Sequence, residues 1–510
     1  MNLKVMGTSY TGIENYLVEV EIDICSGLPQ LSIIGMGDTT IYESRERVRT
    51  AMRNSGYQLP PKKITVNLSP ASIRKEGSHF DLAISTGLGV GMGYIQDKNK
   101  ILENYIIMGE LALNGDVKGV RGVIGGAILT KELGFKGIVV PWDNMEEAGA
   151  IPGIDVIGVK NLTTFFHFIS TGEMEKEEIE IKRGDENLKI IKKEEKFSID
   201  ISEVCGQESA KRALEIAAAG GHNLLLSGSP GSGKSMLAKR IVTILPEMEM
   251  EEIIESSRIY SIMGELSGEN PLVTRRPFRS PHHTGTISSI IGGGRNPRPG
   301  EITMAHNGVL FLDEMSEFSK DVIESLRQPL EDKKVSVSRT GYRLDFPTKF
   351  ILVGATNPCN CGLLFESGDQ CRCSAHEIER YRKKLSGPIV DRMDLYAEIK
   401  KVDQEELLKN FVEREKSEAI KERVARARKI QRERYGKGKL NGDITPREME
   451  QYCYLKEENL QLLKIAGENL KLTARAFHKV IRVARTIADL EISETIEKRH
   501  LLEALSFRKS

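Results

Sequence analysis

The first third of the chain alternates short apolar runs with amphipathic stretches. Along 16–24, apolar residues alternate with acidic ones, which is the period of a half-buried strand. The stretch 39–54 is charged and amphipathic, as a surface helix is. Asn114-Gly115 lies between two apolar runs and indicates a hairpin turn. Strands are predicted at 16–24, 31–35, 63–68 and 137–140, and helices at 39–54, 80–92 and 122–133. The mixture predicts an α+β domain over residues 1–171.

The pattern changes after this domain. Residues 172–197 hold two charge runs with little to bury, which predicts a linker that is partly disordered or β-paired. From 198 to 400, short apolar strands end in polar residues, as in an α/β core. Residues 401–510 have helical patterns that begin at 405–413, so the chain is predicted to end in an all-α lid. The basic run 421–434 either faces a polyanion or is a solvated helix, and a solvated helix is slightly favoured.

Length and charge narrow the classes of protein that are possible. A chain of 510 residues is too long for one core. Lys plus Arg total 73, as do Asp plus Glu, so bulk charge favours no polyanion and a nucleic-acid surface would be a local patch. No apolar run has the length of a membrane helix. The N-terminus does not resemble a signal peptide, and the 7 cysteines lack a pattern of paired spacings. We therefore predict a cytoplasmic protein with no membrane partner.

One stretch matches the phosphate-binding pattern G-x-x-x-x-G-K-[ST] at every fixed position. A short apolar run precedes it and a helical run follows, which is the expected context. The glycines let backbone N–H groups point at phosphate oxygens, and the helix N-terminus adds partial positive charge. Lys234 is predicted to reach the β- and γ-phosphates, and Ser235 to bind Mg²⁺. The predicted ATP-binding residues are Gly228, Ser229, Pro230, Gly231, Ser232, Gly233, Lys234 and Ser235.

Further polar residues follow buried strands downstream. Asp313 and Glu314 end the apolar run 309–312, where Asp313 suits the Mg²⁺ shell and Glu314 suits a base that orients water. With the phosphate loop, this order resembles the AAA+ ATPases. The resemblance implies that Asn357 is the first sensor, Arg392 an arginine finger and Arg475 the second sensor on the lid. A finger acts on a neighbouring subunit's nucleotide, so it implies a ring.

Two basic stretches lie before and after the acidic pair. They resemble hairpins of the helix-2-insert clade, which contains magnesium chelatase, MoxR-type ATPases and MCM helicases. In that clade the hairpins point into the ring's pore. A positive pore lining suits a nucleic-acid backbone, and the alternative is a pair of ordinary solvated loops. His282 and His283 have no spaced acid or cysteine partner, so a structural or pore-loop role is favoured over a metal site. The predicted DNA-contacting residues are Arg295, Arg298, Lys333, Lys334, Arg339 and Arg343.

Cysteines gather just after the predicted sensor. Cys359 and Cys361 form one C-x-C pair, and Cys371 and Cys373 form a second. Four thiolates suit tetrahedral Zn²⁺, although zinc sites use C-x-x-C more often. The alternative is a set of reduced, locally packed thiols.

The N-terminal region resembles the proteolytic domain of Lon, which has a ribosomal-protein-S5-like fold. The resemblance rests on 117–123, 131–135 and 138–141. Lon-type peptidases use a Ser–Lys dyad, but His79 occupies the serine position and Ser78 is one residue away. The lysine position falls near Ile124. A nucleophile without its base is not an enzyme site, so this domain is predicted to be a relative without peptidase activity.

Across its whole length the chain resembles the ComM/YifB family of magnesium-chelatase-like AAA+ proteins. The most specific pieces are 43–49, 74–77, 281–283, 299–301, 357–359 and 483–490. The resemblance implies a hexameric Mg²⁺-dependent ATPase that drives branch migration of single-stranded or branched DNA in natural transformation. Two alternatives stay open. A chelatase motor would need a partner subunit with a metal-adhesion domain, and a protein remodeller would thread a polypeptide past Tyr342.

Overall fold

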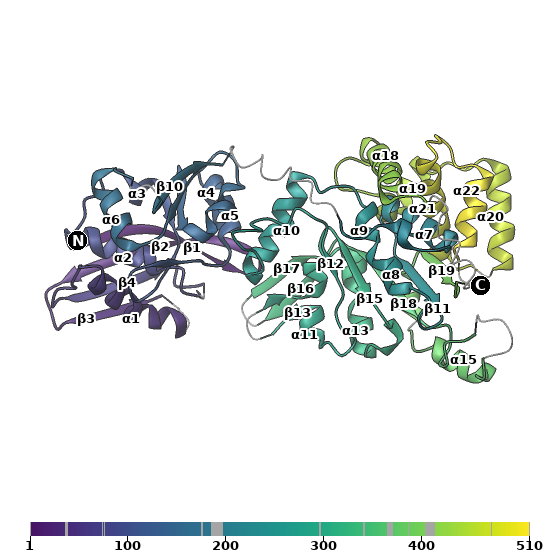
Figure 1. The fold of residues 1–510 in the computed structure, drawn as a ribbon, viewed down its shortest axis with the longest axis horizontal. Helices are drawn as coiled ribbons and strands as arrows, with labels where there is room; N and C mark the ends of the chain where they lie inside the picture. Colours follow the sequence, from purple (N-terminus) through teal and green to yellow (C-terminus); the bar gives the residue numbers. More distant parts are fainter. Residues whose placement is uncertain are drawn as a thin grey trace. The chain divides into compact units, whose positions relative to one another are not determined.

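The computed structural model describes residues 2–35, 39–73, 75, 77–174, 177–184, 197–294, 297–339, 342–364, 371–385, 387–402, 414–470 and 472–508. The chain forms two compact units (Figure 1). The first contains Met1–Glu194 and Glu249–Thr274, and the second contains Glu195–Met248 and Arg275–Ser510. We predicted 249–274 as part of the segment 198–400, whereas it packs in the first unit.

An 8-stranded sheet organises the first unit, in the order β10-β9-β8-β5-β1-β2-β4-β3. Its strands are β1 (Asn2–Thr11), β2 (Glu14–Cys25), β3 (Gln30–Ile34), β4 (Lys63–Ser69), β5 (Tyr105–Ile107), β8 (Gly137–Pro141), β9 (Asp155–Val159) and β10 (Ile179–Arg183). A hairpin joins β6 (Glu110–Leu111) to β7 (Val117–Lys118) at the predicted Asn114-Gly115 turn. β10 pairs antiparallel with β9, so this part of the predicted linker is β-paired.

The helices of the first unit are α1 (Thr39–Asn54), α2 (Asp81–Gly91), α3 (Ile101–Asn104), α4 (Val123–Glu132), α5 (Met145–Gly149), α6 (Leu162–Thr171) and α10 (Met250–Met263). The amphipathic pattern predicted α1 at the residues where it lies. α10 comes from a distant part of the sequence. Its partly buried Ile254, with Leu266 and Leu272 beyond the helix, packs on the core that contains Val123 and Ile124.

A buried carboxylate fastens α10 to the rest of the first unit. Glu147 accepts hydrogen bonds from the Ser261 hydroxyl, from the Asn144 amide at 2.8 Å and from the Ile124 N–H at 3.3 Å. Burial raises the pKa of Glu147, and these three donors oppose that rise. These hydrogen bonds offset the free-energy cost of burying the carboxyl group.

The second unit is built on a 5-stranded parallel sheet in the order β12-β15-β18-β11-β19. Its strands are β12 (Phe278–Arg279), β15 (Val309–Leu312), β18 (Ile351–Thr356), β11 (Leu224–Gly228) and β19 (Leu395–Ile399). Two hairpins stand apart from this sheet: β13 (Gly292–Gly293) with β14 (Arg298–Pro299), and β16 (Lys334–Arg339) with β17 (Tyr342–Pro347). The central strands are buried along their length, as in parallel sheets covered by helices.

Helices complete the second unit. Around the sheet lie α7 (Glu208–Gly220), α8 (Lys234–Lys239), α9 (Ile241–Ile244), α11 (Ile287–Ile290), α12 (Glu301–Met304), α13 (Lys320–Ser325), α14 (Arg327–Asp332), α15 (Ala375–Arg382) and α16 (Gly387–Val390). The C-terminal region contains α18 (Ser417–Tyr435), α19 (Pro446–Tyr452), α20 (Glu457–Asn469), α21 (Ala474–Leu490) and α22 (Lys498–Ser506). This confirms a helical end to the chain, while the predicted helical start at 405–413 lies outside the described residues.

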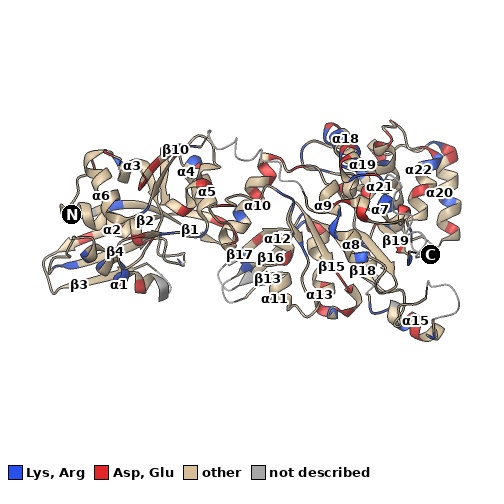
Figure 2. Cartoon of the chain, in the orientation of Figure 1, with Lys and Arg blue, Asp and Glu red and all other residues tan. Residues whose placement is uncertain are grey.

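The basic run of α18 is largely engaged inside the second unit. Arg423 binds Glu215 of α7, Arg428 donates to the Ala218 carbonyl, and Arg434 pairs with the buried Asp489 of α21. Basic and acidic residues both occur along this helix (Figure 2). The arginines therefore join helices together. Among the described helices, none combines the length and apolar character needed to cross a membrane.

Candidate active site

Three neighbouring strands of the second unit end at one edge of the sheet and bring four predicted residues together. Because β11, β15 and β18 are parallel, the residues that follow them meet at the carboxyl edge, where ligands bind in such sheets. Lys234 Nζ lies 3.2 Å from Asn357 Oδ1. Ser235 Oγ lies 2.6 Å from Asp313 Oδ2. We call the residues at this edge the carboxyl-edge site.

The loop between β11 and α8 has the conformation that its glycines allow. Gly231 and Gly233 have φ angles of 75° and 94°, which disfavour other residues. A Cβ on Gly228 would lie 2.3 Å from the Ile399 carbonyl oxygen, so close packing also requires glycine there. The loop turns directly into α8 at Lys234, so its N–H groups and a helix N-terminus face the same place. This arrangement fits a phosphate chain.

The Lys234 ammonium lies at the centre of the site. It donates to the carbonyl oxygens of Gly228 at 2.7 Å and Ser229 at 2.9 Å. Burial lowers the pKa of Lys234, and the charges of Asp313 and Glu314 oppose that shift. A cation desolvated beside two carboxylates suits an anionic ligand that carries a divalent metal ion. The residues therefore fit ATP with Mg²⁺.

The acidic pair divides into an inner and an outer carboxylate. Asp313 accepts the Ser235 hydroxyl and the Glu314 N–H, so hydroxyl and carboxylate oxygens, which Mg²⁺ prefers, meet here. The Glu314 side chain is 61% exposed, and its carboxylate lies 3.7 Å from Nδ1 of His283. An exposed carboxylate next to the metal position can accept a proton from water. The spacing of His283 and Glu314 along the sequence does not indicate this contact.

The two predicted catalytic arginines lie at the opposite edge of the same sheet. Arg392 precedes β19, and its carbonyl oxygen accepts a hydrogen bond from Asn223, which precedes β11. Arg475, on α21, donates to Asp391 at 3.4 Å. Both guanidinium groups approach Glu331, at 2.5 Å for Arg392 and 3.9 Å for Arg475. A strand of 5 residues spans about 16 Å, so neither arginine reaches its own chain's phosphate loop.

The predicted DNA-contacting residues fall into two groups. Lys333 pairs with Asp443 at 3.4 Å, and Lys334 pairs with Asp345 at 2.7 Å, both at the base of the β16–β17 hairpin. Arg343 is nearer the tip, where it pairs in register with Ser338; its side chain is 67% exposed and lies 3.7 Å from Asp345. Arg298 is exposed on β14. Arg295 and the Arg339 side chain lie outside the described residues, although the backbone of Arg339 ends β16. Local carboxylates therefore offset the charge of the basal lysines.

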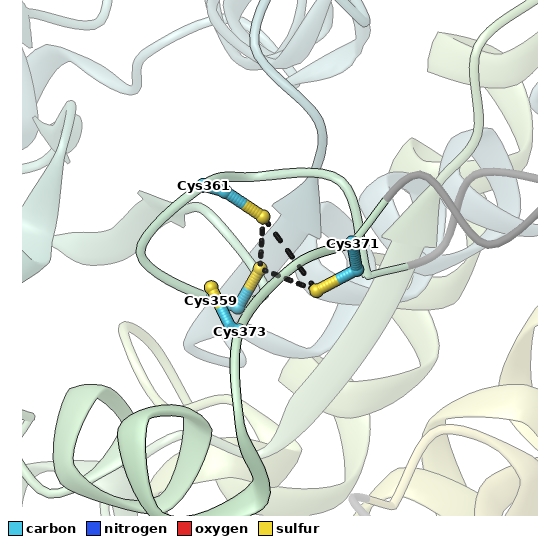
Figure 3. Close-up of side chains that lie close together, drawn as sticks. All are labelled: Cys359, Cys361, Cys371 and Cys373. Carbon is cyan, nitrogen blue, oxygen red and sulfur yellow. Dashed lines mark hydrogen bonds between the residues drawn. The ribbon is translucent and has the colours of Figure 1, made fainter.

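The four predicted cysteine ligands do converge (Figure 3). Their sulfur atoms all lie within 4.8 Å of one another; the residues are Cys359, Cys361, Cys371 and Cys373. All four are free thiols. The pKa of the Cys361 thiol is lowered to about 6, first by a hydrogen bond from the Leu363 backbone and then by Cys359.

The Lon-like dyad positions hold other contacts. The Ser78 hydroxyl binds Glu110, and His79 is buried with its pKa lowered to about 4 by desolvation. Ile124, at the expected lysine position, is buried in the core. These contacts agree with a domain that lacks peptidase activity, which stays a prediction.

The strand order, the phosphate loop and the acidic pair, with the Asn357 amide beside Lys234, indicate a P-loop ATPase of the AAA+ class. The family profile of magnesium chelatase, subunit ChlI, matches residues 200–407. Two related profiles, subunit ChlI of Mg-chelatase and the ChlI C-terminal region, match residues 20–144 and 414–508.

Whole-length relatives are more informative. The uncharacterized protein YifB of Escherichia coli (strain K12) is 40% identical over 509 residues, covering 100% of this chain and 97% of that protein. The competence protein ComM of Haemophilus influenzae is 38% identical over 498 residues, covering 98% of this chain and 95% of that protein. The magnesium-chelatase 67 kDa subunit of Heliobacterium mobile is 25% identical over 231 residues, 39% of this chain and 34% of that protein. The chain therefore belongs to the ComM/YifB family of magnesium-chelatase-like AAA+ ATPases.

Proposed function

We propose that this protein is a ring-forming, Mg²⁺-dependent ATPase that moves along DNA and promotes branch migration during recombination of incoming DNA. The observation that carries the ring is the separation of the two sheet edges. The carboxyl-edge site holds the phosphate and metal residues, whereas Arg392 and Arg475 lie at the amino edge. A ring in which the amino edge of one subunit faces the carboxyl edge of the next would complete each site.

Each residue of the site has a separate task in this proposal. Lys234 binds and orients the terminal phosphates, and Ser235 with Asp313 holds the Mg²⁺, which neutralises charge on them. Glu314 accepts the proton of the attacking water, and Asn357 helps to position that water. Arg392 of a neighbouring subunit stabilises the charge that develops during transfer.

Two observations support DNA as the substrate. The relative named competence protein ComM matches over nearly the whole chain, and the chain carries two hairpins with arginines. We propose that the β13–β14 and β16–β17 hairpins line the pore, as in the helix-2-insert clade. Arg298, Arg339 and Arg343 would contact the DNA backbone. Lys333 and Lys334 would instead support the hairpin, since they lie at its base, where they pair with Asp443 and Asp345.

One experiment tests this proposal. ATP hydrolysis is measured with no DNA, with forked DNA and with four-way DNA, and strand movement is followed on the same substrates. Branched DNA is expected to stimulate hydrolysis, and strands are expected to move only with ATP. Glu314→Gln is the control, because it keeps the binding residues and removes the proton acceptor. Absence of DNA binding and stimulation in the presence of ATP would refute the DNA function. Stimulation by an unfolded protein instead would favour the remodelling alternative.

A further inference from the structure

We propose that Cys359, Cys361, Cys371 and Cys373 bind one structural Zn²⁺, which fastens the sensor segment and the phosphate loop to α15. This goes beyond the proposed DNA function, since it concerns a second metal and its effect on the hydrolysis site.

The spacing of the sulfur atoms fits a single tetrahedral ion. The Sγ atoms of Cys359 and Cys361 are 3.3 Å apart, those of Cys361 and Cys371 are 3.5 Å apart, and those of Cys359 and Cys371 are 3.7 Å apart. Four ligands placed tetrahedrally at a Zn–S distance of 2.3 Å are separated by about 3.8 Å. These three separations are close to that value, and the Cys373 sulfur atom lies within 4.8 Å of the other three.

Backbone N–H groups surround the sulfur atoms as they do in thiolate metal sites. The N–H of Leu363 faces Cys361, that of Cys361 faces Cys373, and that of Cys373 faces Cys371. Such hydrogen bonds stabilise negative charge on sulfur and orient each ligand. One of these contacts lies within a C-x-C pair, from Cys373 to Cys371, and one joins the two pairs, from Cys361 to Cys373.

The donor set selects the metal. Four thiolates are soft ligands, and a tetrahedral S₄ set suits zinc or iron. Closed four-cysteine sites with no position for water are typical of structural zinc, which needs no redox partner. We therefore assign zinc.

The first cysteine pair lies against the hydrolysis machinery. Cys359 is buried and lies two positions after Asn357. The amide oxygen of Asn357 accepts a hydrogen bond from the Lys234 ammonium. A Cβ on Gly362 would lie 2.5 Å from Cδ of Pro230, so the loop after Cys361 packs directly on the phosphate loop. Displacement of this loop would move both the sensor amide and the phosphate loop.

The second cysteine pair, Cys371 and Cys373, directly precedes α15, whose far end contacts residues next to Asp313 and Glu314. Ser374 caps the helix directly after Cys373. At the other end, the Tyr381 hydroxyl lies 2.7 Å from that of Ser316, and Lys384 binds Glu317 at 3.1 Å. Ser316 and Glu317 follow Asp313 and Glu314 along the chain. The ion thus connects, through short rigid segments, three parts of the hydrolysis site.

The metal assignment is tested on the full-length protein by elemental analysis after purification without chelators. Wild type and Cys25→Ser, which alters an isolated exposed cysteine, are expected to carry one zinc per chain. Cys371→Ser is expected to lose it. If Cys371→Ser does not fold, wild type loaded with Co²⁺ gives the answer, because a four-thiolate site produces intense sulfur-to-cobalt charge-transfer bands. Folded wild type without metal, or Cys371→Ser that retains zinc, overturns the site. Iron in place of zinc overturns the choice of metal.

The positioning role is tested by the split between kcat and KM. Metal removal from folded protein is expected to lower kcat for ATP by about tenfold or more while ATP still binds, because small displacements of catalytic groups are costly. Gly362→Ala, which leaves all four thiols in place, is expected to keep the zinc and also lower kcat. Zinc-free protein with unchanged kcat refutes the role, and neither measurement depends on stimulation by DNA.

Discussion

The two edges of the parallel sheet in the second unit are built differently. At the carboxyl edge the key groups are partly open: Glu314 is 61% exposed, and the Lys234 ammonium is held mainly by carbonyl oxygens. At the amino edge, buried charges are locked together. Asp394 accepts the Asn223 N–H at 2.9 Å and pairs with Lys479 at 3.3 Å. The carboxyl edge can therefore admit a ligand, whereas the buried ion pairs of the amino edge, here called the locked edge, hold its residues in place.

The difference explains why arginines lie where they do. Lys479 of α21 also donates to the Met393 carbonyl at 3.1 Å, so the lid helix is clamped on the segment next to Arg392. Arg475 is one helical turn from Lys479 and therefore faces the same segment. The locked edge thus presents two arginines at fixed positions. We infer that each subunit carries half of two sites. The Arg392 and Arg475 variants below test this inference, and two further predictions concern the rigidity of the amino edge and the hairpins.

The largest effect is expected from Arg392. Arg392→Ala should lower kcat by about 10³-fold, as removal of an arginine finger does, with ATP binding retained. Glu314→Gln should also abolish hydrolysis while keeping binding. Mixing the two inactive variants should restore activity, because some interfaces then join an intact carboxyl edge to an intact amino edge. Steady-state phosphate release measures all three.

Two results would break the comparison. A mixture that stays inactive although the variants assemble together would mean that both edges must be intact in one chain. Full activity of Arg392→Ala alone would remove its catalytic role. Arg426→Ala is the matched control, since it removes an exposed arginine of α18 from the same unit.

The locked edge should loosen in acid. His222 is buried with Nε2 2.7 Å from the Thr486 hydroxyl, and burial lowers the pKa of His222 from 6.5 to about 4. Because the folded state disfavours its protonation, this stability is complete above pH 6.5 and is lost as the pH falls towards 4. Between these two pH values the free energy of unfolding falls by about 3 kcal/mol.

Hydrogen exchange of the β11 and β19 amides at pH 4 and pH 7 measures this loss locally. In His222→Gln the pH dependence should shrink by about one proton. His376→Gln, at an exposed site on α15, should leave it unchanged. An unchanged profile in His222→Gln would assign the acid sensitivity to other groups.

Arg475 should have a smaller effect than Arg392. Its side chain is 66% exposed and its hydrogen bond to Asp391 is long, at 3.4 Å. Loss of one charge-assisted contact corresponds to about a tenfold fall in kcat. Arg475→Lys keeps the positive charge and should therefore recover part of the lost kcat. If the kcat of Arg475→Ala equals that of wild type, Arg392 is the one arginine of this pair that the amino edge contributes to hydrolysis.

The smallest effect concerns the hairpins. Arg343→Ala should reduce the salt dependence of DNA binding by about one ion per removed phosphate contact. Lys334→Ala should change it less, because Lys334 is 48% exposed and lies 2.7 Å from Asp345, whereas Arg343 is 67% exposed and lies 3.7 Å from that carboxylate. DNA binding measured over a series of salt concentrations separates the two. Equal slopes for both variants would mean that position along the hairpin does not decide DNA contact.

Residues fixed by local rules were predictable from sequence. The phosphate loop needs its glycines at fixed spacing, and Asp313 and Asn357 each follow a buried strand, so their convergence follows from parallel pairing. The four cysteines converge for a similar reason, since two short-range pairs need just one loop to meet. The helix α1 was recognisable because one amphipathic stretch defines it.

Partners chosen over long range were not predictable. Nothing in the sequence links Glu331 to Arg392 and Arg475, or Asp443 to Lys333, because surface ion pairs carry no periodic signal. The same holds for α10, whose apolar stripe predicts burial without saying against which core. The short strand β5 pairs with β1, which is distant in sequence, and was missed.

The insertion of α10 into the first unit makes the chain cross between the units three times, near residues 194, 248 and 274. A protease that cut once near residue 194 would yield two polypeptides on a denaturing gel, 1–194 and 195–510. Under native conditions they would remain one particle, because α10 travels with the larger piece while its partners Glu147 and α4 belong to the smaller. Deletion of residues 1–197 would strip α10 of its core. The first unit therefore cannot be removed cleanly by truncation, because residues 249–274 of its own core lie between two segments of the second unit.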